Sequence, residues 1–150
     1  GLELVDGDAH PDIQSSELTG RGLQRVRWRR YEIESYLVHP AALDRFVEKQ
    51  VGPGDHSKTA RADLLVRLRE MFTELTDAFC RDPLGPPPLV EKFLETTKAR
   101  SAILPPLLAA AGLHGFPYTR YHEIAAVMLP EEIHPEVTEK LDAIQRAFAL

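Results

Sequence analysis

The sequence holds a single cysteine, Cys80, and no long apolar run. One cysteine excludes an internal disulfide framework and a multi-cysteine zinc site, and it fits a reducing cytoplasm. No stretch approaches the roughly 20 apolar residues that cross a bilayer, and we expect no secretory leader, because no charged-then-apolar segment stands at the start. The GxxxxGK(S/T) and GxGxxG motifs are missing as well, which excludes nucleotide binding by those two routes. We therefore expect a cytoplasmic protein that does not enter a membrane.

What the sequence does contain is the composition of an ordinary globular domain. Of its 150 residues, 43% are hydrophobic and 27% are charged, and the formal net charge is −5. A chain of this length buries roughly two-thirds of its unfolded surface, which suits one domain rather than two. The chain opens with Gly1 rather than methionine and runs straight into an apolar stretch, so we expect a fragment of a longer protein.

The N-terminal residues predict two strands. Residues 2–5 (Leu-Glu-Leu-Val) are short, apolar and followed at once by an acidic turn, which is typical of a buried strand. Residues 9–22 contain Pro11 and two glycines and predict a loop. Residues 23–28 place apolar side chains among arginines and predict a second strand. We expect these strands to run parallel in a small sheet.

The remainder of the chain predicts helices. Pro40 suits the first turn of a helix that ends before Gly52. Apolar residues recur at helical spacing over 57–80 and predict a long amphipathic helix, with Asp55 or Ser57 as its cap. The fold class is therefore α/β and helix-rich, with few parallel strands followed by packed α-helices. Further helices are expected over 90–100 after a proline-rich connector at 82–88, as a restart through Pro105 ending at Gly112, near 120–128 with Thr119 as the cap, and from Pro135 onwards.

Two carboxylates follow the first predicted strand. In an extended backbone, side chains two residues apart point to the same side, so Asp6 and Asp8 would converge just past the carboxyl end of that strand. Such a pair needs a cation to neutralise it, and oxygen-only ligands suit Mg²⁺ or Mn²⁺. The alternative is an ordinary turn, because aspartate and glycine are common turn formers.

A second acidic pair follows the second predicted strand. If the backbone there is extended, Glu32 and Glu34 share a face while Ile33 packs inward. If a helix starts instead, the two carboxylates diverge by about 200° and only one reaches a metal ion. The alternative role is a solvated acidic patch that balances the neighbouring arginines.

The arginines before this pair reverse the sign of the chain's net charge locally. Clusters of this kind supply phosphate contacts in nucleic-acid binding, although arginines on a surface strand also serve solubility alone. A basic stripe beside four carboxylates is what phosphodiester cleavage requires, because arginines hold the backbone while carboxylate-bound metals activate water. The residues concerned are Arg21, Arg25, Arg27, Arg29 and Arg30.

Together these segments resemble a known family. The string Leu-Val-Asp6-Gly-Asp8, followed by Arg-Arg-Tyr-Glu32-Ile-Glu34-Ser-Tyr-Leu-Val-His-Pro, resembles the C-terminal Toprim nuclease region of the OLD (overcoming lysogenization defect) family. The closing stretch Ile-Ala-Ala-Val-Met-Leu-Pro-Glu-Glu-Ile-His-Pro-Glu-Val looks like the helical tail of the same group, and the middle of the chain matches only loosely.

The resemblance implies a Mg²⁺- or Mn²⁺-dependent DNA endonuclease with two divalent cations in the intact site. Residues 1–50 would be the C-terminal part of a truncated, Toprim-like (Rossmann-like) metal-binding core, and 51–150 a helical region packed on it in one continuous domain. The family also implies an ABC-type ATPase domain ahead of this region and a further acidic residue on an earlier strand. A homodimer is compatible with the sequence.

The resemblance also assigns roles to individual residues. Asp6 and Asp8 would occupy the DxD positions, and Glu32 and Glu34 the acidic positions of the second motif, with Asp6, Asp8 and Glu32 catalytic. A lysine in the following helical part assists catalysis in this family, and Lys98 would correspond to it. Arg25, Arg27, Arg29 and Arg30 would contact DNA.

The rival hypothesis is a helical protein-interaction or dimerisation module without catalysis. In that case the amphipathic helix over 57–80 and the last helix form a docking surface, and the acidic pairs are only turns.

Overall fold

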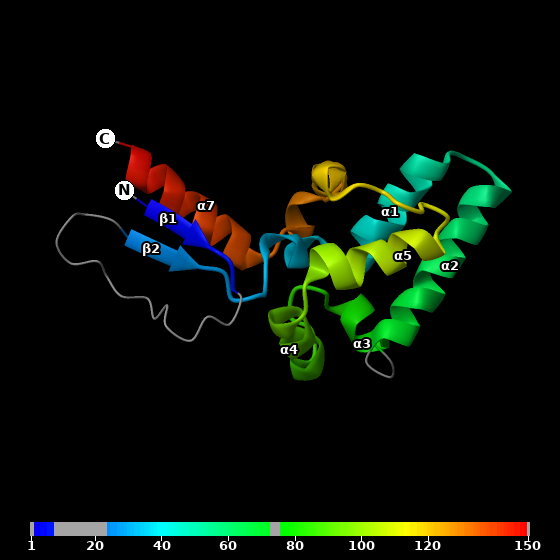
Figure 1. The fold of residues 1–150 in the computed structure, drawn as a ribbon, viewed down its shortest axis with the longest axis horizontal. Helices are drawn as coiled ribbons and strands as arrows, with labels where there is room; N and C mark the ends of the chain where they lie inside the picture. Colours follow the sequence, from blue (N-terminus) through cyan, green and yellow to red (C-terminus); the bar gives the residue numbers. More distant parts are fainter. Residues whose placement is uncertain (1, 8–23, 73–75, 150) are drawn as a thin grey trace.

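The computed structural model describes residues 2–7, 24–72 and 76–149 (Figure 1). Strands β1 (Leu2–Val5) and β2 (Gln24–Arg27) pair in parallel, with Leu2 opposite Gln24 and Val5 opposite Arg27. The backbone N–H of Trp28 donates to the Val5 carbonyl at 3.1 Å, which continues the pairing one residue beyond β2. The prediction of a helix-rich chain with a small parallel pair near its start is confirmed. That this pair belongs to a Toprim-like sheet stays a prediction.

Helices make up most of the described chain, and prolines open several of them. Because proline has a fixed φ and no N–H to satisfy, it fits the first helical turn, and it stands there in α1, α4, α5 and α7. The bounds are η1 (Ile33–Leu37), α1 (Pro40–Val51), α2 (Asp55–Phe72), α3 (Thr76–Arg81), α4 (Pro88–Thr96), the π-helical η3 (Ala99–Ile103), α5 (Leu104–Ala110), η4 (Tyr118–Arg120), α6 (His122–Ala125), η5 (Pro130–Glu132) and α7 (Pro135–Phe148).

Two helix predictions need correction, and a third is tested only in part. The helix expected over 90–100 ends at Thr96. The helix expected over 57–80 is described as α2 and α3, and the residues between them, 73–75, lie outside the described part of the chain. The helix expected near 120–128 is shorter, and Thr119 does not cap it. Residues Tyr118–Arg120 form a 3₁₀ turn, so Tyr121 stands at the cap position of α6.

The hydrophobic core lies between α1, α2 and α5, away from the strands. One face of α2 is buried from Ala60 through Leu64 and Leu68 to Phe72, and α2 contacts both α1 and α5. Burying a leucine or phenylalanine side chain stabilises a fold by about 1.5–3 kcal/mol, so this layer holds the helices together. The fully buried side chains include Leu43, Phe46, Phe79, Leu94, Ile103, Leu104, Leu107, Leu108 and Ile124.

The strand pair lies at the opposite end of the molecule from α1 and α2 (Figure 1). Helix α7 lies at the same end of the molecule as the strand pair. No residue of α7 is fully buried. Its first turn is fixed by polar contacts, because the Glu136 carboxylate accepts a hydrogen bond from the Arg29 N–H at 2.8 Å and another from the Tyr36 hydroxyl. Within the ranges described, no helix has the length and apolar composition that crossing a bilayer requires.

Candidate functional site

Gly7 fixes the segment that directly follows β1. We call this segment the acidic turn, and the structure describes its residues Asp6 and Gly7. A Cβ atom added to Gly7 would lie 1.9 Å from the Arg30 carbonyl oxygen and 2.6 Å from that of Trp28, so only glycine fits there. The Gly7 carbonyl accepts a hydrogen bond from Nη2 of Arg27 at 2.9 Å. The turn is therefore pressed against the backbone that follows β2. Asp6 is exposed and directly follows the carboxyl end of β1; that it binds a ligand there stays a prediction.

Asp8 lies outside the described residues, so its position relative to Asp6 stays a prediction.

Glu32 makes a contact that the sequence did not predict. Its side chain is 6% exposed, and Oε1 accepts a hydrogen bond from the backbone N–H of Arg100 at 2.6 Å. Arg100 lies in the first turn of η3, where backbone N–H groups lack partners and a negative charge is stabilising. The Glu32 carboxylate therefore acts as a cap for η3.

The backbone after Glu32 decides between the two arrangements considered for the second acidic pair. Glu32 is extended, with φ −149° and ψ 167°, and the 3₁₀ helix η1 begins at the next residue. Ile33 is 50% exposed, so the arrangement in which Ile33 packs inward and both glutamates share a face is wrong. The helix start separates Glu34 from Glu32.

Glu34 is half-buried near the ring of Tyr121. Burial raises the pKa of the Tyr121 hydroxyl, the negative charges of Glu34 and Glu32 raise it further, and Arg100 opposes them. The hydroxyl donates to the Arg100 carbonyl at 3.3 Å. Glu34 therefore lies in the same neighbourhood as the cap of η3.

The described residues do not complete a metal site. Among them, no group of three or more histidine, cysteine, aspartate or glutamate side chains lies close enough to hold a metal ion. Asp6, Glu32 and Glu34 are thus not gathered into one cage, and the Glu32 carboxylate already accepts a hydrogen bond from Arg100. The predicted Mg²⁺ or Mn²⁺ site therefore depends on Asp6 together with Asp8.

Arg30 is buried rather than open to phosphate. Its side chain is 2% exposed, and Nε and Nη2 donate to the two carboxylate oxygens of Glu91 at 3.2 and 2.9 Å. Nη1 donates to the Ser35 carbonyl at 3.2 Å. The Arg29 side chain is 55% exposed, but it pairs with Glu91 at 3.0 Å and with Glu95 at 3.7 Å. Of these two predicted DNA contacts, only Arg29 is accessible to a ligand.

The other basic residues predicted to act in the site are Arg25, Arg27 and Lys98. Arg27 is half-buried and contacts the Gly7 carbonyl, while the side chain of Arg25 lies outside what the structure describes. Lys98 is exposed, and its Nζ lies 5.9 Å from the ring centroid of Tyr31. Lys98 stands two residues before Arg100, so it borders the Glu32 contact.

Sequence reasoning overlooked Arg100 and Tyr118. The guanidinium carbon of Arg100 lies 4.9 Å from the ring centroid of Tyr118, whose side chain is 58% exposed. An available signal was the pair of cations at 98 and 100, placed just before a proline-opened helix.

A polar network beside the strand pair joins η1 to α7. The Tyr36 hydroxyl accepts a hydrogen bond from the Arg30 N–H at 3.2 Å and donates one to Glu136. Burial and the contact with Glu136 raise the pKa of Tyr36 far above its ordinary value. Nδ1 of His134 accepts from the Glu136 N–H at 3.1 Å and so caps α7. These contacts position α7 and leave the tyrosine protonated.

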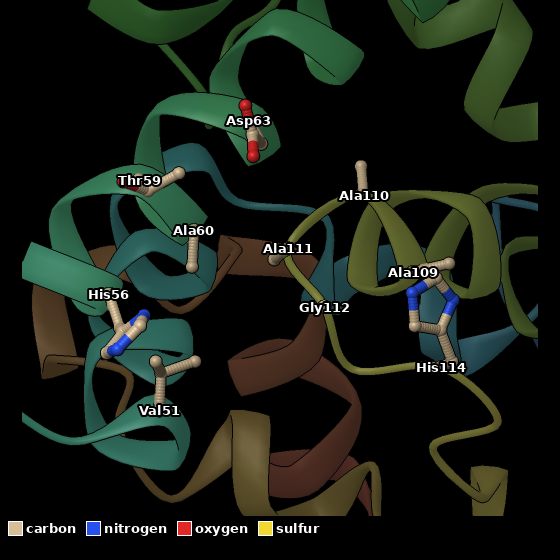
Figure 2. Close-up of a pocket in the computed structure, with 10 residues that line it drawn as sticks. All are labelled: Val51, His56, Thr59, Ala60, Asp63, Ala109, Ala110, Ala111, Gly112 and His114. Carbon is tan, nitrogen blue, oxygen red and sulfur yellow. The ribbon is translucent and has the colours of Figure 1, made fainter.

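A surface hollow of about 490 Å³ lies between the first half of α2 and the end of α5. Figure 2 shows His56 and His114 on opposite sides of it, with Asp63 at a separate point of the rim. Its remaining lining is mostly alanine and glycine. None of the predicted site residues that the structure describes lines the hollow, so the hollow is separate from Asp6 and Gly7.

Comparisons with protein-family models, with curated proteins and with solved structures find no match to the chain.

Proposed function

We propose that this chain forms part of a divalent-metal-dependent DNA endonuclease of the Toprim type, as its resemblance to the OLD family implies. One observation carries the proposal. Gly7 presses the acidic turn against the backbone of Trp28 and Arg30, at the carboxyl end of two parallel strands. Ligands of open α/β sheets bind at this edge, and carboxylate oxygens are the ligands that a divalent cation such as Mg²⁺ prefers.

The proposal divides the acidic residues into two kinds. Asp6 and Asp8 bind Mg²⁺ or Mn²⁺, and the cations of the intact site activate water for attack on the phosphodiester. Glu32 holds η3 in place through Arg100 and acts as a positioning residue rather than as a ligand. Further ligands come from outside the described residues, in line with the additional acidic residue that the family implies.

The proposed setting follows from the same resemblance. The endonuclease works on DNA in the cytoplasm, and an ABC-type ATPase domain precedes it in the same protein.

A metal titration tests this function. Binding of Mn²⁺ to the folded state stabilises the chain in proportion to RT ln(1 + [L]/Kd), about 2.7 kcal/mol at a hundredfold excess over Kd. We expect Asp6→Asn to abolish this thermal shift and the metal-dependent nicking of supercoiled plasmid by the full-length protein. Asp63 is an exposed aspartate on α2, and Asp63→Asn is the matched control. We expect this variant to keep both the thermal shift and the nicking activity. Nicking at the unchanged rate by the Asp6→Asn protein would overturn the proposal.

The second candidate is the helical interaction module. It is favoured by the lack of a three-ligand group among residues 2–7, 24–72 and 76–149. Exposed apolar side chains on two helices also favour it, namely Leu65 and Val66 on α2 and Leu141 and Phe148 on α7. Two results together would support this candidate. The chain would show no Mn²⁺ response, and light scattering would detect a dimer that Leu141→Ser and Phe148→Ser abolish.

A further inference from the structure

Two pairs of a cation and an aromatic ring lie around the start of η3. Nζ of Lys98 lies 5.9 Å from the ring centroid of Tyr31, and Cζ of Arg100 lies 4.9 Å from that of Tyr118. Both cations are exposed, and so is most of the Tyr118 side chain. We call these four residues the basic–aromatic strip.

Hydrogen bonds to the core fix the three segments that carry the strip. The Tyr31 N–H donates to the Leu94 carbonyl at 3.1 Å. The Arg100 N–H donates to Glu32, and the Arg100 carbonyl accepts from the Tyr121 hydroxyl at 3.3 Å. Tyr121 is itself buried in the hydrophobic core. The strip therefore has a defined backbone, so a ligand would find its side chains largely preorganised.

The cations of the strip contact aromatic rings but are not neutralised by a carboxylate among the described residues. Within the part of the chain that the structure describes, no ion pair joins Lys98 or Arg100 to a carboxylate, whereas Arg29 and Arg30 both pair with Glu91. A guanidinium lying over a ring adds a flat, delocalised cation to the exposed tyrosine. In a chain of net charge −5, this is a surface where an anion is attracted.

The strip also borders the acidic turn. Tyr31 directly follows Arg30, and the Arg30 carbonyl oxygen is the atom against which Gly7 packs. Glu32, which follows Tyr31, holds the first turn of η3. A strand of nucleic acid that contacts the strip at Tyr31 would therefore lie next to the backbone against which the acidic turn packs.

We propose that the basic–aromatic strip binds an unpaired stretch of DNA, with Lys98 and Arg100 contacting phosphates and Tyr118 stacking on a base. This choice of partner rests on the proposed function. Cationic side chains interleaved with exposed aromatic rings are the recurring surface for single strands, because every unpaired base presents a face for stacking. In a duplex the base faces are already stacked on one another, so an exposed tyrosine ring finds no face to stack on and only edges, sugars and phosphates remain to contact.

Fluorescence anisotropy with a labelled oligothymidylate in EDTA tests the strip without any metal ion. We expect Tyr118→Ala to weaken binding about tenfold and to leave the salt dependence unchanged, because a stacking contact is lost. Tyr118→Phe keeps the ring and binds like the unchanged chain. Arg100→Gln weakens binding and lowers the slope of log affinity against log salt by about 0.7, the value for one phosphate of a single strand.

A matched control comes from α7. Arg146→Gln removes an exposed arginine outside the strip and is expected to leave affinity unchanged. Equal losses in the control and strip variants would overturn the assignment of the surface. Equal affinity for a duplex of the same length, or for an acidic peptide, would overturn the choice of an unpaired strand.

The outcomes also separate this inference from the proposed function. If Tyr118→Ala and Arg100→Gln bind normally while Asp6→Asn stops nicking, the strip is wrong and the endonuclease stands. If the strip variants lose binding while Asp6→Asn nicks at the unchanged rate, the binding surface stands and the metal-dependent function is wrong.

Discussion

Arg30 and Glu91 lie sixty-one residues apart in the sequence and form a bidentate ion pair, with both carboxylate oxygens accepting from one buried guanidinium. The pair joins the segment after β2 to α4. Burial alone would raise the pKa of Glu91, but the hydrogen bond and charge of Arg30 outweigh it and leave that pKa below its ordinary value. Glu91 is thus held ionised as part of the fold.

The first prediction concerns this pair. Glu91→Ala leaves a buried guanidinium without its carboxylate and should lower the free energy of unfolding by about 3–5 kcal/mol. Glu95→Ala removes only a partly exposed contact to Arg29 and should change stability by less than about 0.5 kcal/mol. Urea unfolding followed by circular dichroism measures both. Similar losses in the free energy of unfolding for the two variants would show that the buried pair stabilises the fold no more than the exposed contact does.

The second prediction is the pH dependence that His134 creates. Burial, and then the charge of Arg30, lower its pKa below 6.5 in the folded state. The unfolded chain therefore binds the proton first, so the contribution of neutral His134 is complete above pH 6.5 and is lost as the pH falls toward the folded pKa. The cap of α7 requires the neutral imidazole ring, because Nδ1 of His134 accepts a hydrogen bond from the backbone N–H of Glu136.

Urea unfolding at several values between about pH 7.5 and about pH 5.5 checks this slope. His134→Asn should flatten it while retaining a capping side chain. His39, whose pKa is also lowered mainly by burial, should keep part of the slope in this variant. Replacing exposed His114 by asparagine is the control and should leave the full slope.

The third prediction concerns the acidic turn. Gly7→Ala introduces a Cβ that overlaps the main-chain oxygen atoms of Trp28 and Arg30, which cannot move away without displacing the backbone that follows β2. We expect a loss of about 1–3 kcal/mol in stability, together with the loss of any Mn²⁺ response. Gly85→Ala is the control, because the added Cβ meets only the side chain of Asp82, which can rotate. Thermal melts with and without Mn²⁺ supply both readouts.

The fourth prediction separates a positioning role for Glu32 from a ligand role. Glu32→Gln keeps an oxygen that accepts from the Arg100 N–H, so it should fold normally and respond to Mn²⁺ as before. Glu32→Ala removes this acceptor and should cost about 1.5–3 kcal/mol, as expected for a hydrogen bond to a charged group. Loss of the Mn²⁺ response in the glutamine variant, with stability unchanged, would make Glu32 a ligand after all.

The parts of the fold that follow local rules could be predicted from the sequence. Pro40 and Pro135 mark the starts of α1 and α7, and the apolar spacing from Leu64 onward indicates the buried face of α2. The two short strands were recognisable because each apolar run meets a turn or a charged segment. These signals act within a few residues and require no knowledge of distant partners.

The candidate site depended on contacts that no local pattern records. In the sequence, Arg29 and Arg30 look like two solvated side chains. Arg30 can be buried because Glu91, on the distant helix α4, pairs with its guanidinium. Glu32 resembles a metal ligand until η3 places the Arg100 N–H against it. In both cases the tertiary partner decides the role of a charged side chain. The sequence therefore indicates which segments are rich in charge and leaves open which of those charges remain available.

The contact of Gly7 with main-chain oxygens also bears on how such a protein tolerates change. Because the turn rests on carbonyl groups, its position depends on the path of the main chain at residues 28 and 30 rather than on direct contact with their side chains. A single inserted or deleted residue in that short stretch would move the supporting carbonyls and shift the turn that carries Asp6. Divergence by substitution is thus compatible with this edge, whereas divergence in length is not.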